Sequence, residues 1–203
     1  MYKKKMYCIL VAGLPASGKT VMADVLSKDL GIPVISKDKI KEIMYDTVGF
    51  HSRKEKVALG VASMEIMYYM AEQHMKCGLP FILENNFEHI SREGLEKLLC
   101  KYGYHGITVL LTGDDRILYQ RFVARNGTAE RHRGHVVNDC YPEKERREVP
   151  PMSYEAFVNG FTERGMDNFS IGDSKIIVDT TDFKKVDYVG LLRKIKELID
   201  KNP

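Results

Sequence analysis

Residues 13–20 read Gly-Leu-Pro-Ala-Ser-Gly-Lys-Thr, and this spacing of glycines, a lysine and a hydroxyl side chain can bind phosphate. The glycines allow the loop to curl, so that its backbone N–H groups point inward at an anion. An apolar run at residues 6–12 precedes the loop, and a helical pattern follows it. This order of strand, GxxxxGK[ST] loop and helix predicts a nucleoside triphosphate site, in which Lys19 reaches the β- and γ-phosphates and Thr20 ligates Mg²⁺.

The whole loop is expected to contact the nucleotide. Its residues are Gly13, Leu14, Pro15, Ala16, Ser17, Gly18, Lys19 and Thr20. A guanine-reading NKxD sequence is absent, and the DxxG match at residues 46–49 falls in a helical pattern before the third strand. We therefore expect ATP with Mg²⁺ rather than GTP.

Short apolar segments alternate with helical patterns along the chain. The expected strands are residues 6–12, 32–36, 79–83, 107–111 and 176–178, and the expected helices are residues 19–30, 39–47, 54–76, 91–102, 114–125 and 182–200. The strands lack polar alternation, as expected when helices cover both faces of a parallel sheet. This pattern predicts a three-layer α/β/α P-loop NTPase fold with a five-stranded, mainly parallel sheet. The length of 203 residues fits one domain over residues 1–203.

Two of the expected helices carry more specific predictions. Ser91 is the expected N-cap of the helix at residues 91–102. In the helix at residues 54–76, apolar side chains recur at helical spacing and are expected to pack in the core. They are Val57, Val61, Met64, Met67 and Met75.

The composition is that of an ordinary globular protein, with 44% hydrophobic and 29% charged residues. A net charge of +3 argues neither for nor against nucleic acid as a partner. No apolar run approaches the roughly 18–20 residues of a membrane span. The four cysteines are scattered and form no CxxC pair. We expect reduced thiols in a cytoplasmic protein that does not engage a membrane.

Polar side chains stand where the second and third strands end, which is where open α/β sheets bind ligands. Residues 36–38 are Ser-Lys-Asp, and residues 84–86 are Glu-Asn-Asn. Asp38 is expected to face the γ-phosphate and accept a proton from a substrate hydroxyl, although either Asp38 or Ser36 could also cap the next helix. Glu84 closes an apolar strand, so it needs a metal, a substrate or a basic partner.

The segment at residues 126–152 is polar, rich in Arg and His, and irregular. A loop of this length in a compact domain is often a lid. Arg121 and Arg125 form an i, i+4 pair just before it, and Arg131 lies within it. Phosphoryl transfer requires positive charge around the transferred group, and lid arginines can supply it. Alternatively, these arginines form only a solvent-exposed basic face with no role in catalysis.

The segments GLPASGKT, ISKDKIKEIMYD, FILENNF and RFVARNGTAERHRGH together resemble the small P-loop kinases of the AAA type. Members include the kinase domain of polynucleotide kinase–phosphatase, the zeta toxins and chloramphenicol phosphotransferase. The resemblance spans residues 7–199. It implies that Asp38 is the general base and that Arg121 and Arg125 are lid arginines with a catalytic role.

The resemblance also bears on the two ligands. Lys41 stands where the polynucleotide kinase-like members carry an arginine that contacts substrate, and this departure weakens any claim to the same acceptor. Residues 179–181 fall in the region that borders adenine in such kinases, which makes Thr180 an expected nucleotide contact.

Together these features predict an ATP-dependent kinase that phosphorylates a hydroxyl of a small molecule, such as a nucleoside, sugar nucleotide, antibiotic or related metabolite. The residues expected to contact the acceptor are Lys37, Asp38, Lys41, Glu84, Asn86 and Arg131. A nucleic-acid 5′-hydroxyl is the alternative acceptor, but it would favour an extended basic groove with exposed aromatic residues. The phosphate loop is also compatible with an ATP hydrolase or with a nucleotide-bound regulatory protein.

Overall fold

The computed structural model describes residues 5–172 and 174–201. A five-stranded sheet forms its centre, in the order β2-β3-β1-β4-β5, and every neighbouring pair is parallel. The strands are β1 (Tyr7–Gly13), β2 (Val34–Ser36), β3 (Phe81–Glu84), β4 (His105–Thr112) and β5 (Ser174–Asp179). The register places Leu10 of β1 between Leu83 of β3 and Thr108 of β4. The predicted three-layer fold is confirmed.

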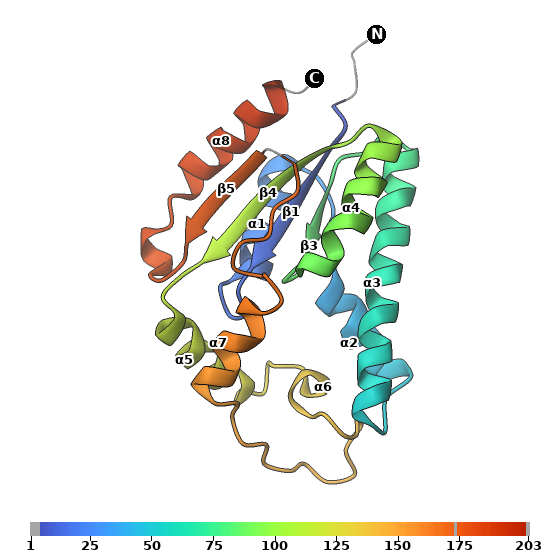
Figure 1. Ribbon diagram of the computed structural model, residues 1–203, viewed down its shortest axis with the longest axis vertical. Coiled ribbons are helices and arrows are strands. Elements are labelled where there is room, and N and C mark those ends of the chain that lie inside the picture. The colour runs from blue at the N-terminus through green and yellow to red at the C-terminus, as the bar shows by residue number, and fades with distance from the viewer. Residues whose placement is uncertain (1–4, 173, 202–203) are drawn as a thin grey trace.

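Helices cover both faces of the sheet (Figure 1). They are α1 (Lys19–Leu30), α2 (Lys37–Thr47), α3 (Arg53–Lys76), α4 (His89–Tyr102), α5 (Asp115–Asn126), α6 (Arg133–Val136), α7 (Tyr154–Thr162) and α8 (Tyr188–Lys201), with a 3₁₀ turn at Phe183–Lys185. Helices α3 and α4 share one core cluster with the sheet, and α1 and α8 share the other. Within the described residues, no helix is long and apolar enough to cross a membrane.

Successive residues of β1 pack on opposite faces of the sheet. Cys8 and Leu10 join the cluster beneath α3 and α4, whereas Ile9 and Val11 join the cluster beneath α1 and α8. All four are fully buried. A strand buried on both faces needs apolar side chains at every position, which explains why its sequence lacks polar alternation.

Two helix starts differ from the sequence prediction. Helix α4 begins at His89 with Glu88 as its N-cap, and Ser91 is a buried residue inside the helix. The predicted cap at Ser91 is therefore wrong. The predicted C-terminal helix at residues 182–200 is interrupted, because a 3₁₀ turn at Phe183–Lys185 ends before α8 begins at Tyr188.

The predicted apolar stripe on α3 is only partly in the core. Met67 and Met75 are buried, but Val57 and Val61 are 50% and 58% exposed. Core contacts cover the second half of the helix, whereas the first half extends past the end of the sheet (Figure 1). The stripe therefore overestimated how much of this long helix packs against the sheet, because its first half packs on α2 and on the cluster around Phe50 instead.

The segment at residues 126–152 is more ordered than the expected irregular loop. It contains α6, and Tyr141 pairs antiparallel with Phe50 ahead of α3. Its Val137 is buried with Tyr45 and Phe50 in a separate apolar cluster. A few apolar residues within a polar sequence thus anchor the segment, which crosses from α5 to the lower end of α3 and returns to α7 (Figure 1).

Candidate active site

The loop between β1 and α1 has the geometry of a phosphate site. Gly18 is the N-cap of α1 and has a left-handed backbone with φ of 85°, which other residues rarely adopt. The loop opens on a cleft of about 640 Å³ beyond the carboxyl ends of the strands. Pro15, Ala16 and Thr20 line this cleft, whereas Leu14 and Ser17 are buried behind it.

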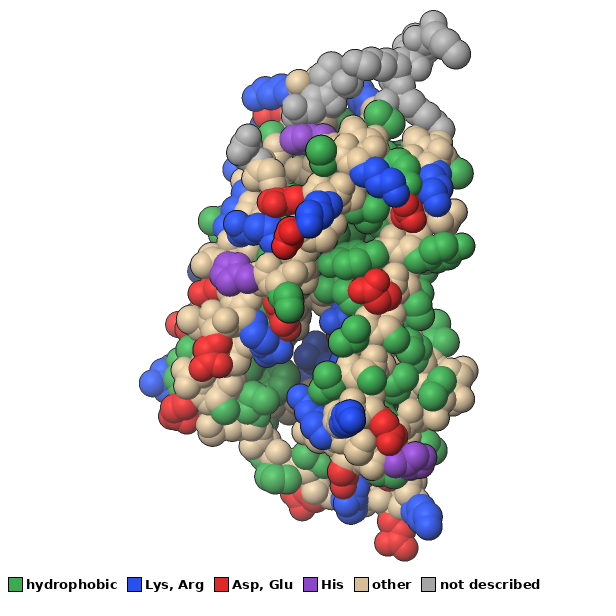
Figure 2. All heavy atoms as spheres, turned by 45° about the vertical axis from the view of Figure 1, so that its right-hand side comes forward, with side chains coloured by type: hydrophobic (Ala, Val, Ile, Leu, Met, Phe, Trp, Pro, Cys, Tyr) green, Lys and Arg blue, Asp and Glu red, His purple; other side chains and the backbone are tan. Residues whose placement is uncertain are grey.

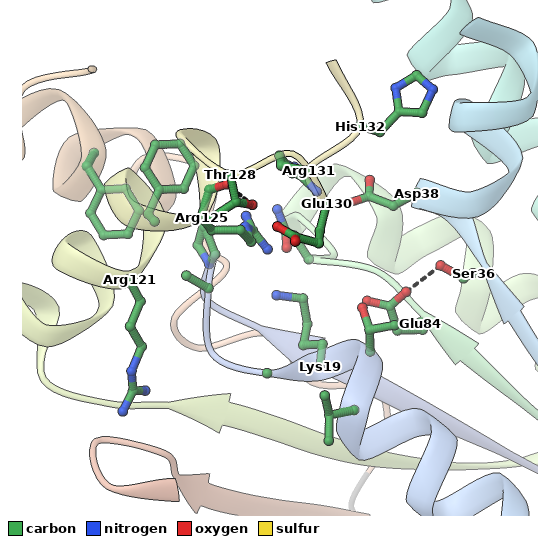
Figure 3. A pocket seen from close by; sticks show the side chains of 18 of the residues that line it. Lys19, Ser36, Asp38, Glu84, Arg121, Arg125, Thr128, Glu130, Arg131 and His132 are labelled. Carbon is green, nitrogen blue, oxygen red and sulfur yellow. Dashed lines mark hydrogen bonds between the residues drawn. The ribbon is translucent and has the colours of Figure 1, made fainter. Parts of the chain in front are cut away.

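Lys19 extends into the cleft from the first turn of α1 (Figure 3). Only 8% of it is exposed, and its Nζ donates a hydrogen bond to the Leu14 carbonyl at 2.6 Å. Burial lowers the pKa of Lys19 to about 8, and the carboxylates of Glu84 and Asp38 partly offset that effect. A ligand that brings negative charge would stabilise this buried ammonium group.

Arg125 and Arg131 face the same cleft and join Lys19 there (Figure 3), and we term these three side chains the cationic cluster. The Nε atom of each is buried and has no hydrogen-bond partner among the described residues. Burial and the charge of Arg131 lower the pKa of Arg125 to about 10. Buried donors without acceptors are costly in a folded protein, so this arrangement fits an anion that is bound between the two arginines.

Glu84 lies at the end of β3 beside the loop, and only 4% of it is exposed. Ser36 Oγ donates to Glu84 Oε2 at 2.5 Å, and Thr20 lies beside this carboxyl group. Burial raises the pKa of Glu84, although the hydrogen bond from Ser36 and the charge of Lys19 oppose the shift. Thr20 and Glu84 thus present adjacent oxygen donors, which are the ligands that Mg²⁺ prefers.

Asp38 extends into the cleft from the first turn of α2. The N-cap of α2 is Ser36, whose Oγ accepts from the backbone N–H of Lys39. Burial favours the neutral acid, but His135, Arg131 and Lys41 outweigh it and hold the pKa of Asp38 below its ordinary value. Asp38 is therefore ionised at neutral pH and can accept a proton.

Arg121 has different partners from those expected of a catalytic residue. Its guanidinium donates to the carbonyls of Thr180 and Thr181, each at 2.7 Å, and lies over the ring of Phe183 at 3.9 Å from the centroid. Figure 3 shows it directed away from Lys19. Arg121 in this structure holds the loop after β5 and does not join Arg125 in the cationic cluster.

Thr180 also differs from its expected role. It is 1% exposed, and its hydroxyl donates to the Thr112 carbonyl at 2.7 Å. This side chain ties the ends of β4 and β5 together and does not line the cleft. The nearby ring of Phe183, which does line the cleft, was not predicted from the sequence.

The residues expected to contact the acceptor are divided by the fold. Asn86 lines the cleft with Asp38, Glu84 and Arg131. Lys37 and Lys41 lie on α2 but do not line it. The Nζ atom of Lys41 instead lies over the ring of Tyr45, at 5.5 Å from the centroid.

Several residues in and around the cleft were not predicted from the sequence. A ring nitrogen of His135 is hydrogen-bonded to Glu42 at 3.1 Å, and the imidazole acts on the charge of Asp38. On the opposite wall, Met152 precedes α7, which contributes Ala156 and Gly160. The local signal for this wall is Ser153 followed by an i, i+4 pair of phenylalanines.

Comparisons with known proteins agree with this fold. The family model of an AAA domain matches residues 8–140. A structure from Chloroflexus aurantiacus that is assigned as a kinase has 22% sequence identity and a TM-score of 0.74, and the similarity covers 98% of this chain and 99% of that one. A gluconokinase from Sinorhizobium meliloti has 13% identity and a TM-score of 0.59, covering 98% and 97% of the two chains. A shikimate kinase from Bacteroides thetaiotaomicron has 13% identity and a TM-score of 0.52, covering 96% and 99%. Among curated proteins, none matches this sequence.

The match over residues 8–140 includes the phosphate loop, Asp38, Glu84 and both arginines of the cationic cluster. The chain belongs to this AAA domain family of P-loop proteins. The solved structures show that its fold is the one also found in small P-loop kinases.

Proposed function

We propose that this protein transfers the γ-phosphate of ATP to a hydroxyl group of a small-molecule acceptor. The observation that carries the proposal is the arrangement of Lys19, Arg125 and Arg131 around the cleft, with the carboxylate of Asp38 in the same cleft beside Arg131 (Figure 3). The cationic cluster suits the transferred phosphate, and an ionised carboxylate suits the acceptor hydroxyl. A protein that only bound a nucleotide would need the first feature but not the second.

The three cations would act on the phosphates at different positions. Lys19 follows the phosphate loop and would contact the β- and γ-phosphates. Arg125 lies on α5 and Arg131 follows it, and both line the cleft, where they would contact the equatorial oxygens of the transferred group. In a loose transition state these oxygens carry much of the charge, so positioned cations are the main source of catalysis.

Asp38 would orient the acceptor hydroxyl and accept its proton as the new O–P bond forms. The low pKa of Asp38 reflects His135, Arg131 and Lys41 against the opposing effect of burial. Phosphates bound beside Arg131 would neutralise part of this positive field and make the carboxylate more basic. Binding of ATP would thus prepare Asp38 for its role as general base.

Thr20 and Glu84 are the residues that would hold Mg²⁺. Their oxygen atoms are adjacent and are of the kind that Mg²⁺ prefers. Burial raises the pKa of Glu84, and a bound cation would stabilise its ionised form. Bound with ATP, Mg²⁺ would neutralise charge on the β- and γ-phosphates. Ser36 fixes Glu84 through its hydrogen bond, so the carboxylate is oriented before any ligand arrives.

The shape of the site favours a small acceptor over a nucleic-acid end. The cleft of about 640 Å³ includes the phosphate loop, so ATP would fill part of it and leave room only for a small acceptor; small-molecule pockets usually span roughly 300–1,000 Å³. Figure 2 shows a hollow with Lys and Arg side chains in its interior rather than along an extended groove. The bound nucleotide would be ATP, because the guanine-reading NKxD sequence is absent.

Product analysis with γ-labelled ATP tests the proposal. The protein is incubated with Mg²⁺ and a panel of nucleosides, sugars, hydroxy acids and a 5′-hydroxyl oligonucleotide. Label on a small molecule is the expected result. Label on the oligonucleotide alone would identify the alternative acceptor, and free phosphate alone or unreacted ATP would contradict the kinase proposal.

A further inference from the structure

Lys56 is buried near the cleft, and the site described above does not account for it. It lies in the first turns of α3, and only 5% of it is exposed. A lysine is rarely buried so far unless its amino group is fully hydrogen-bonded, because removing the charge from water is costly. The contacts of this amino group therefore show what the residue does.

The Lys56 amino group bonds to three oxygens of the segment between α5 and α7. Nζ donates to the carbonyl of His135 at 3.2 Å, to the carbonyl of Val137 at 2.5 Å and to Oδ1 of Asn138 at 3.1 Å. An ammonium group has three donors, so these oxygens satisfy every one. Burial, with Lys41, Arg53 and Arg131 nearby, lowers the pKa of Lys56 to about 7. Hydrogen bonds to oxygen acceptors favour the charged form of an amine and so oppose this effect.

Other hydrogen bonds also join the segment around residues 135–141 to α2 and to the connection before α3. Phe50 and Tyr141 exchange backbone hydrogen bonds of 2.8 Å in each direction. His135 pairs with Glu42 of α2 at 3.1 Å. Residues 132–141, which we term the anchored segment, are therefore joined to α2, to α3 and to the connection between them.

The anchored segment begins at the residue after Arg131. On the other side of the junction, Asp38 lies one helical turn before Glu42, the partner of His135. The junction that Lys56 completes thus connects a cation of the proposed phosphate site with the proposed general base. Lys19 lies on α1 and Arg125 on α5, so neither belongs to the elements that this junction joins.

We propose that Lys56 is a positioning residue, which fastens the anchored segment to α2 and α3 and so holds Arg131 and Asp38 on one rigid unit. Opening of the cleft would then separate this unit from Lys19 and Arg125, while Arg131 and Asp38 keep their mutual position. The catalytic consequence rests on the proposed kinase function. The anchoring itself does not depend on that function, and amide hydrogen exchange measures it independently of activity.

The test compares Lys56→Met with Lys54→Met, which makes the same change at an exposed site of the same helix. In Lys56→Met, amide exchange at Val137 and Tyr141 should be about ten- to a hundredfold faster than in the wild type, because hydrogen bonds to a charged group are lost. The turnover number kcat for phosphoryl transfer should fall by about ten- to a hundredfold through displacement of Arg131. The affinity for an ATP analogue should stay within about twofold, and Lys54→Met should match the wild type in all three.

The wild-type protein supplies the check if Lys56→Met fails to fold. The amides of Phe50, Val137 and Tyr141 should remain protected to the same extent with and without a nonhydrolysable ATP analogue. Amide exchange in the wild type as fast as in an exposed loop would overturn the proposal. A folded Lys56→Met protein with unchanged amide exchange, or with unchanged kcat, would overturn it as well. If the wild type phosphorylates no acceptor, the proposed function fails, while the exchange data still decide whether the anchoring exists.

Discussion

The hydroxyl of Ser36 donates to Oε2 of Glu84 across 2.5 Å and joins the ends of β2 and β3 beside the phosphate loop. The hydroxyl oxygen of Ser36 also accepts from the backbone N–H of Lys39 and thereby caps α2. Ser36 therefore performs the capping role that the sequence also allowed for Asp38. The carboxylate of Asp38 is left to face the cleft.

Asp38→Asn separates catalysis from capping. Phosphoryl transfer should fall by about 10²- to 10⁴-fold, because the amide cannot accept the proton of the acceptor hydroxyl. ATP affinity should persist, since the phosphate loop is unchanged. Asp38→Asn and Asp38→Ala should have similar melting temperatures, because each removes a charge that His135, Arg131 and Lys41 stabilise and neither removes the cap. Ser36→Ala removes the cap and should lower stability by about 0.5–2 kcal/mol. Full phosphoryl transfer by Asp38→Asn would exclude Asp38 as the base.

Lys19→Ala tests the assignment of the phosphate loop. The substitution removes the cation that reaches the β- and γ-phosphates, so ATP affinity should fall about ten- to a hundredfold. Folding should change little, because the hydrogen bond that the buried amino group makes within the protein goes to a single carbonyl, that of Leu14. Fluorescent ATP titration and thermal unfolding measure the two effects. Lys28→Ala, near the exposed end of the same helix, is the matched control; if both variants bind ATP equally well, the assignment is wrong.

The pH dependence of ATP binding follows from the same lysine. Burial lowers the pKa of Lys19 to about 8 in the ligand-free protein, and bound phosphates would raise it. Above pH 8, binding therefore requires proton uptake, and affinity should fall as pH rises, by up to about tenfold per pH unit. Dissociation constants from pH 7 to 9.5 measure the effect. The dependence should be weaker in Lys19→Ala, and an identical dependence in both proteins would contradict this explanation.

The fold and the phosphate loop could be predicted because their signals are local. A glycine-rich loop between an apolar strand and a helix specifies its geometry within a few residues, and buried parallel strands are apolar throughout. The position of Glu84 and Asp38 at the cleft could also be predicted, because the carboxyl ends of parallel strands meet at one edge of the sheet. These predictions required no knowledge of how distant segments pack.

The remaining features depend on contacts between distant segments. Lys56 meets its partners in the anchored segment across roughly 80 residues of sequence, and no local pattern indicates that such a lysine is buried. Arg121 has the same spacing from Arg125 whether its guanidinium joins the cationic cluster or bonds to the Thr180 carbonyl, so the sequence could not separate the two roles. Helix α7 is different, because its cap at Ser153 is a local signal from which the helix could have been predicted.

Gly134→Ala tests the close packing between the anchored segment and α2. A Cβ atom at this position would lie 2.3 Å from Cδ2 of the buried Tyr45 ring, so the segment or the ring must move. Overpacking of this kind typically destabilises by about 1–3 kcal/mol, and displacement of Arg131 should reduce phosphoryl transfer as well. Gly127→Ala is the matched control, because its Cβ would meet only ordinary contacts at 3.4 Å and beyond. Urea unfolding and transfer assays of the two variants measure the difference. Equal stability of the Gly134→Ala and Gly127→Ala proteins would show that the anchored segment does not pack on Tyr45 in solution.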